Sequence, residues 1–176
     1  MTGPPGGIEL SVQDLRAVAR FAAESAREVL PVFEDRHPQD RRPRLAVEAA
    51  WVFAEGARRT NLQRTTATAA HRAAREAATE AARHAARAAG HAAASAYLHP
   101  LARATQVRHI LGAAAHAVRA AELAAGDDRA VGARLIEEAR QRAAPGLVVV
   151  LRRYPAAPLG GDRVAELMQA LDSSLR

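Results

Sequence analysis

Apolar residues in the first part of the chain recur with the spacing of a single helix face. Between positions 15 and 33 they fall three, four or seven residues apart: Leu15, Val18, Ala19, Ala22, Ala26, Val29 and Phe33. This spacing places them on one side of an α-helix. Ser11 and Asp14 form a capping-box pattern, so we expect the helix to begin there. We expect Pro31 to end its regular part, because proline removes a backbone donor.

Similar patterns, bounded by proline, glycine or capping residues, predict further helices. They are expected over residues 43–56, 65–97 and 100–125, after Asp127 or Asp128, and after Asp162. The run LVVVL at residues 147–151 is compatible with a strand by propensity. No other segment alternates with period two, so a short buried helix is our interpretation of residues 147–153, with a strand as the alternative.

Alanine sets the character of these helices. The chain has 46 alanines among its 176 residues, and aromatic residues make up only 3%. Alanine is the best helix former, and its small side chain lets two helix backbones approach closely. The stretch over residues 100–125 is apolar on both sides, which is typical of a central helix with neighbours on each side. The alanine faces could pack within one chain or across a homodimer.

The sequence therefore predicts an all-α fold, a single-domain bundle of about six to seven helices with alanine-rich close packing. Residues 1–8 are rich in glycine and proline, and we expect a disordered N-terminus there, followed by one helical domain over residues 9–176. Neither a signal-peptide pattern nor an uninterrupted apolar stretch of membrane-spanning length is found in the sequence. We expect a cytoplasmic protein that does not associate with membranes.

The basic residues are better explained by a solvated helical surface than by a nucleic-acid site. All 25 are arginine, and they are spread among 19 acidic residues to give a formal net charge of +6. A nucleic-acid site would gather them on one face, so a nucleic-acid partner is not expected. The densest basic patch is the charged loop that holds Arg36, Arg41, Arg42 and Arg44. These four are our candidates for contacting an acidic partner.

Four segments, in this order, resemble a known family. They are ELSVQDLRAVARFAAESAREVLPVFE, DRRPRLAVEAAW, AARAAGHAAASAYL and RLIEEARQRAAPGL. Together they are similar to the Imm-5-like family of helical bacterial immunity proteins, over roughly residues 9–154. The resemblance implies a protein that protects its producer by sequestering a toxin or another harmful agent. It carries over no catalytic residue.

Histidines supply the candidate ligand-binding residues. His84 and His91 are seven residues apart, as are His109 and His116, so each pair lies on one side of its helix. A hairpin that turns near His99 would place His91 opposite His109 and His84 opposite His116. The candidate ligand-binding residues are therefore His84, His91, His99, His109, His116 and Glu80. Three roles stay open: half-buried structural histidines, a ligand or metal site, and a pH sensor.

Two functions follow from these observations. The first is a non-enzymatic binding protein, an immunity or self-protection protein that sequesters a protein toxin. The alternative is a helical protein that binds a small-molecule ligand or a metal, and that could be an enzyme, with a histidine-lined pocket between the 65–97 and 100–125 helices. The chain has no cysteine, no G-x-S-x-G motif and no phosphate loop, so we name no catalytic residue and expect no cofactor.

Overall fold

The computed structural model of the chain describes residues 7–176, and within that range it has eight α-helices and no β-strand. The helices are α1 (Val12–Glu34), α2 (Arg42–Ala54), α3 (Asn61–Glu76), α4 (Glu80–Ala94), α5 (Val107–Ala124), α6 (Arg129–Arg142), α7 (Pro145–Arg152) and α8 (Arg163–Leu175). Two 3-10 turns, η1 (Ser95–Tyr97) and η2 (Ala104–Gln106), separate α4 from α5. Most of the N-terminal segment that we expect to be disordered, residues 1–6, lies outside the described residues.

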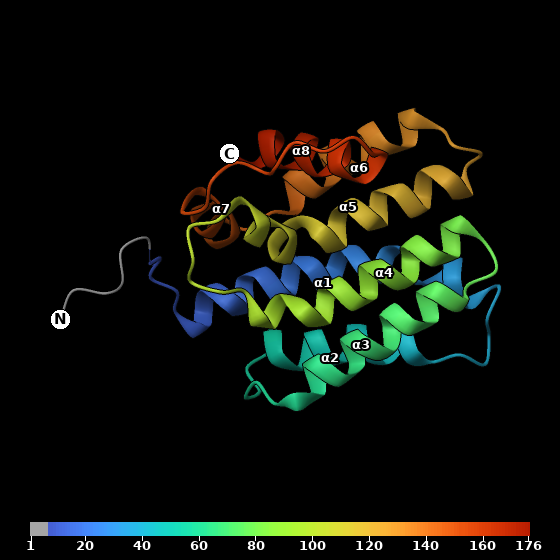
Figure 1. The fold of residues 1–176 in the computed structure, drawn as a ribbon, viewed down its shortest axis with the longest axis horizontal. Helices are drawn as coiled ribbons and strands as arrows, with labels where there is room; N and C mark the ends of the chain where they lie inside the picture. The colour runs from blue at the N-terminus through green and yellow to red at the C-terminus, as the bar shows by residue number, and fades with distance from the viewer. Residues whose placement is uncertain (1–6) are drawn as a thin grey trace.

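The helices are stacked in layers (Figure 1). In that view α2 and α3 lie at the bottom, α1 and α4 in the middle, α5 above them, and α6 and α8 at the top. Helix α4 contacts α1, α2, α3 and α5, and α5 contacts α1, α4, α6 and α8. The predicted all-α bundle with close packing is confirmed, as is the central position of α5. No helix within residues 7–176 is long and apolar enough to cross a membrane.

Two cores of different composition meet at α1 and α5. The core between α1, α2, α3, α4 and α5 is made mostly of alanine. On α4 the buried alanines are Ala82, Ala85, Ala86, Ala88, Ala89, Ala92 and Ala93. The core between α1, α5, α7 and α8 contains large aliphatic side chains, among them Ile110, Leu111, Leu147 and Leu171. The first core depends on close backbone approach, and the second on the apolar area that each side chain buries.

The long helix expected over residues 65–97 is wrong, because the chain reverses direction inside it. Ala77 has an extended backbone conformation and ends α3, and the Thr79 side chain caps α4 by accepting from the Ala82 N–H. His37, from the loop after α1, accepts a hydrogen bond from the Ala78 N–H at 3.1 Å. These bonds replace helical ones, so α3 and α4 pack side by side as a hairpin. This break raises the helix count to eight, above the six to seven expected.

Three other boundaries differ from or refine the sequence analysis. Helix α1 continues through Pro31 to Glu34, because Phe33 is anchored in the core. Residues 100–103 are not helical, and the Pro100 carbonyl accepts from the Ile8 N–H at 3.0 Å. The run at 147–151 is helical, as interpreted, within α7.

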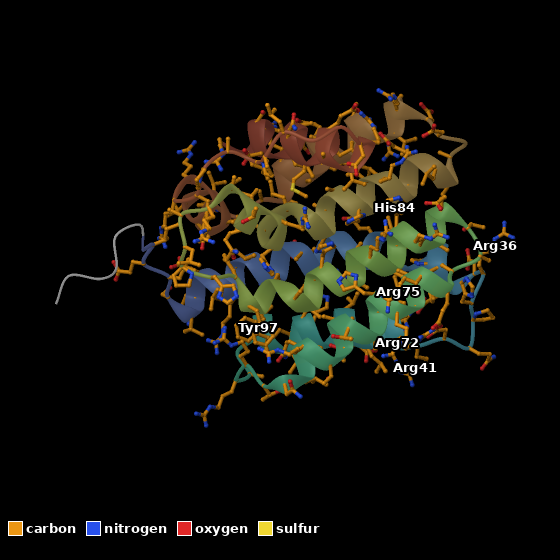
Figure 2. The ribbon with its side chains drawn as sticks, viewed as in Figure 1. Arg36, Arg41, Arg72, Arg75, His84 and Tyr97 are labelled. Atoms are coloured by element: carbon orange, nitrogen blue, oxygen red, sulfur yellow. The ribbon has the colours of Figure 1, made fainter. Side chains whose placement is uncertain are left out.

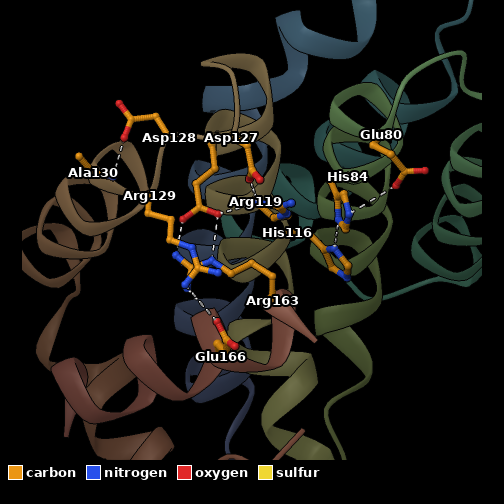
Figure 3. Close-up of polar contacts among 11 residues, drawn as sticks. Glu80, His84, His116, Arg119, Asp127, Asp128, Arg129, Ala130, Arg163 and Glu166 are labelled. Carbon is orange, nitrogen blue, oxygen red and sulfur yellow. Dashed lines mark hydrogen bonds and ion pairs between the residues drawn. The ribbon is translucent and has the colours of Figure 1, made fainter. Parts of the chain in front are cut away.

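A buried carboxylate joins α5, α6 and α8. Glu122 of α5 is fully buried and accepts one hydrogen bond from Arg119 Nη1 at 3.0 Å. It accepts two more from Arg163 of α8, from Nε at 3.1 Å and from Nη2 at 2.5 Å. Gly132 of α6 leaves the space that this carboxylate occupies, because a Cβ there would overlap Glu122 Oε1. Figure 3 shows Arg119 and Arg163, with their polar contacts as dashed lines.

Removing this carboxylate should cost far more stability than removing an exposed one. In Glu122→Ala, Arg119 and Arg163 lose a fully buried partner, and we expect unfolding free energy to fall by about 3 kcal/mol. Glu138→Ala is the matched control, since Glu138 forms an exposed pair with Arg134 at 2.8 Å, and its loss should be below about 0.5 kcal/mol. Urea unfolding followed by circular dichroism measures both. Equal losses would contradict the proposed role of Glu122.

Candidate functional site

Four histidines form a continuous row across three helices. His71 of α3 meets His91 of α4 edge to face, with ring centroids 5.1 Å apart. His91 stacks on His116 of α5 at 5.0 Å, and His116 stacks on His84 of α4 at 5.1 Å. The Nδ1 atoms of His84 and His116 are 2.8 Å apart, so one donates a hydrogen bond and the other accepts it. We call these four residues the histidine row.

Two glycines make room for the row. A Cβ at Gly90 of α4 would lie 2.7 Å from Cε1 and Nε2 of His71. A Cβ at Gly112 of α5 would lie 3.0 Å from Nδ1 of His91. Real Cβ atoms rarely approach other atoms so closely. Glycine is a poor helix former, so each of these positions costs helix stability. In return, the missing Cβ leaves space for an imidazole from a neighbouring helix.

Burial keeps the row uncharged at neutral pH. It lowers the pKa of His84 to about 4, and the nearby Arg87 charge acts in the same direction. Burial also lowers the pKa of His91 to about 3, with smaller effects from His71 and Arg108. The pKa of His116 is well below its ordinary value for the same reason, and His91 and His84 add to the effect. The row is thus a wall of neutral imidazoles.

Three histidines of the row form one wall of a cavity of about 760 Å³. His84, His91 and His116 line it from α4 and α5, and the segment from Pro158 to Met168 lines it from the opposite side. Four arginines also line it: Arg87, Arg108, Arg119 and Arg163. Figure 3 shows two of them, Arg119 and Arg163, beside His116. The cavity therefore combines neutral imidazoles, guanidinium groups and an apolar side.

The structure brings together part of the predicted set of ligand-binding residues. His84 faces His116 as expected, but His91 stacks on His116 and not on His109. His109 instead pairs with His99, at a centroid distance of 6.4 Å. Glu80 lies at the edge of the row, with Oε2 4.0 Å from His84 Nε2. The expected His91–His109 pair is therefore absent from the part of the chain that the structure describes.

Sequence reasoning did not select His71 or the cavity arginines. His71 joins the row only because the chain reverses between α3 and α4. Arg87 could have been selected from its spacing in the sequence. It lies three residues after His84 and four before His91, which puts all three on one helix face. Arg119 likewise follows His116 by three residues.

The four loop arginines predicted to contact a partner fall into two groups. Arg42 is paired with Asp40 at 2.7 Å and with Glu76 at 2.5 Å, and Arg44 is paired with Glu34 at 2.6 Å. Arg36 and Arg41 are exposed, and neither has an ion pair within residues 7–176. Figure 2 shows both at the end of the molecule where α3 ends, which also carries Arg72 and Arg75, with Arg36 at the outer edge. Intramolecular ion pairs thus occupy half of the predicted patch.

No group of three or more histidine, aspartate or glutamate side chains within the described range is placed to hold a metal ion. The row has the ligand type that many metals accept, but each imidazole packs against another ring. What the arrangement offers chemically is hydrogen bonding from neutral rings and positive charge from arginines.

The Gly90–His71 contact predicts that the effect of Gly90→Ala on stability depends on His71, which a double-mutant cycle measures. Gly90→Ala should destabilise the protein, because the new Cβ displaces the His71 ring. In a His71→Ala background the same change should be neutral or should stabilise by up to about 1 kcal/mol, through helix propensity. Urea unfolding of the four proteins gives the coupling. The same sign in both backgrounds would show that the contact does not constrain position 90.

The neutral row predicts loss of stability in mild acid. An unfolded histidine binds its proton near pH 6.5, whereas folded His84 binds it near pH 4. Between these values the unfolded state holds more protons, so stability decreases as the pH falls. At pH 5 His84 alone should account for a loss of about 2 kcal/mol.

Urea midpoints between pH 7.5 and 5 measure this slope. His84→Asn should make it shallower, and His99→Asn, which replaces an exposed histidine outside the row, is the matched control. A profile that stays flat in the wild-type protein would contradict a row that is neutral in the folded state.

Comparisons with known proteins identify the family. No curated protein and no solved structure matches the chain. A family model described as Imm-5 like putative immunity protein matches residues 9–144. This range takes in α1 to α6 and the whole histidine row, whereas α7, α8 and the apolar side of the cavity lie beyond it. Because the match covers well over half of the chain, the protein belongs to the Imm-5-like family.

Proposed function

We propose that this protein is an immunity protein that protects its producer by binding a protein toxin, without transforming it. Membership of the Imm-5-like family over residues 9–144 is the observation that carries this proposal. The binding surface is a further step, and it comes from the arrangement of arginines at one end of the molecule.

We assign the toxin contact to the end formed by the α1–α2 loop and the end of α3. Two contacts hold these segments together: the Arg42–Glu76 ion pair and the hydrogen bond from the Ala78 N–H to His37. Four exposed arginines gather there without an ion pair in the described residues: Arg36, Arg41, Arg72 and Arg75. We call them the basic end.

The basic end suits an acidic partner. Its guanidinium groups are solvated and held on a firm scaffold, so they can attract carboxylates over a Debye length and then pair with them. Rim charges of this kind act mainly on the association rate and on its salt dependence. An enzyme site would require reacting groups set against one another, and the basic end offers charge alone.

Charge reversal at the basic end tests the proposal. The products of the genes that neighbour this one are tested as toxins, and toxicity in a host cell is the readout. Co-expression of the wild-type chain should restore growth, and Arg36→Glu with Arg41→Glu should lower affinity for the toxin at least about tenfold. The affinity of the wild-type protein should also fall as salt is raised.

The control for this experiment is Arg58→Glu with Arg103→Glu, which changes the net charge equally at two exposed arginines elsewhere. The control should bind the toxin like the wild type. If the wild-type chain neither binds the toxin nor restores growth, immunity by sequestration is wrong. If both double variants lose binding equally, the effect is one of net charge and the basic end is not the contact.

A further inference from the structure

The geometry points to a binding site for a small organic anion in the cavity beside the histidine row. The anion would carry a carboxylate or a phosphate on an apolar body. Arg87 and Arg108 would hold its charged group, and the segment from Pro158 to Met168 would cover its body. This site is separate from the basic end and does not depend on toxin binding.

Two of the four cavity arginines have a carboxylate partner, and the other two, Arg87 and Arg108, have none in the described residues. Arg119 is paired with Glu122 and Asp127, and Arg163 is paired with Glu122 and Glu166. Arg87 and Arg108 have neither an ion pair nor a side-chain hydrogen bond to any residue in the range 7–176.

Acidic side chains in the cavity do not offset these two charges. The acidic residue among those that line it is Asp162, whose carboxylate caps α8 by accepting from the Ala165 N–H at 2.8 Å. The cavity thus holds two positive charges that the described protein does not balance, and a bound anion would balance them.

The histidine wall is suited to an anion that brings hydrogen-bond acceptors. Imidazoles that stay neutral give the cavity donor and acceptor atoms without more positive charge. Arg87 lies three residues after His84 and four before His91 on one face of α4, and it lines the same cavity as both histidines. An anion bound by Arg87 would therefore lie within reach of these rings.

The other side of the cavity indicates that the ligand has an apolar body besides its charged group. Pro158, Leu159, Val164, Ala165 and Met168 present apolar surface. The cavity volume of about 760 Å³ lies within the range of small-molecule sites, and an inorganic ion would leave most of it unfilled. These features favour an organic anion over free phosphate.

A matched series of naphthalene probes tests the inference on the full chain. The probes are 2-naphthoate, 1-naphthyl phosphate and the uncharged 2-naphthol, with inorganic phosphate as the bare anion, and titration calorimetry measures their affinity. Both naphthyl anions should bind at least about tenfold more tightly than 2-naphthol and than inorganic phosphate. Raising the salt from about 50 to about 300 mM should weaken the anions and leave 2-naphthol unchanged.

Arg87→Gln with Arg108→Gln should remove the preference for the anions, and Arg58→Gln with Arg103→Gln is the control with the same charge change. Circular dichroism and urea midpoints check that each variant folds. Val164→Trp, which places a large side chain in the cavity, is a second variant and should weaken all naphthyl probes.

Four results would overturn the inference. One is failure of both naphthyl anions to bind at about 1 mM. Another is equal affinity for 2-naphthoate and 2-naphthol. The third is anion binding that the Arg87 and Arg108 changes leave intact. Tight binding of inorganic phosphate alone would mean an ion site without an organic ligand, and would also reject it.

Discussion

Close contact between alanine-bearing helix faces is the constraint on which the rest of this structure depends. Helix α4 is surrounded by α1, α2, α3 and α5, and seven of its fifteen residues are buried alanines. A buried alanine removes little apolar area from water, so these helices gain stability only if their backbones come near enough for many atom contacts. The same closeness brings His71, His84, His91 and His116 from three helices into ring contact.

The larger side chains of the second core hold the remaining helices against this alanine core. Helix α5 takes part in both cores, with alanines toward α4 and Ile110 and Leu111 toward the aliphatic side. Glu122, near the end of α5, then fixes α8 through Arg163. That contact also positions one side of the cavity, because α8 and the segment before it form the side opposite the histidines. Packing of the second core and the shape of the candidate site are therefore linked through α5.

Local signals in the sequence predicted the helices well, whereas contacts between distant residues could not be predicted. The caps at Ser11, Asp128 and Asp162 lie where the side-chain patterns indicated. The break at residues 77–79 lies in an alanine-rich stretch whose local preference is helical, and His37, which bonds there, is about forty residues away. A prediction from local helix preference alone therefore continues the helix through residues 77–79.

The predicted His91–His109 pair failed for a related reason. It assumed that both helices run up to a turn at His99, but α4 ends at Ala94 and α5 begins at Val107. The connection between them includes two 3-10 turns and an extended stretch held by Ile8. This changes the register, so that His116 lies between His84 and His91. The predicted His84–His116 pair is therefore formed, whereas His109 pairs with His99 and not with His91.

The charge state of the histidine row depends on the arginines beside it. Arginine stays protonated in proteins, so Arg87 and Arg108 keep their charge in the cavity at any physiological pH. A protonated histidine beside them would add repulsion to the cost of burying its own charge, and both effects lower the histidine pKa values. The neutral imidazoles in turn let two uncompensated guanidinium groups remain close by. A wall of lysine or arginine in place of histidine would raise the local charge, whereas a wall of leucine would offer a ligand no hydrogen bonds. Histidine, kept neutral by burial among alanines, meets both requirements.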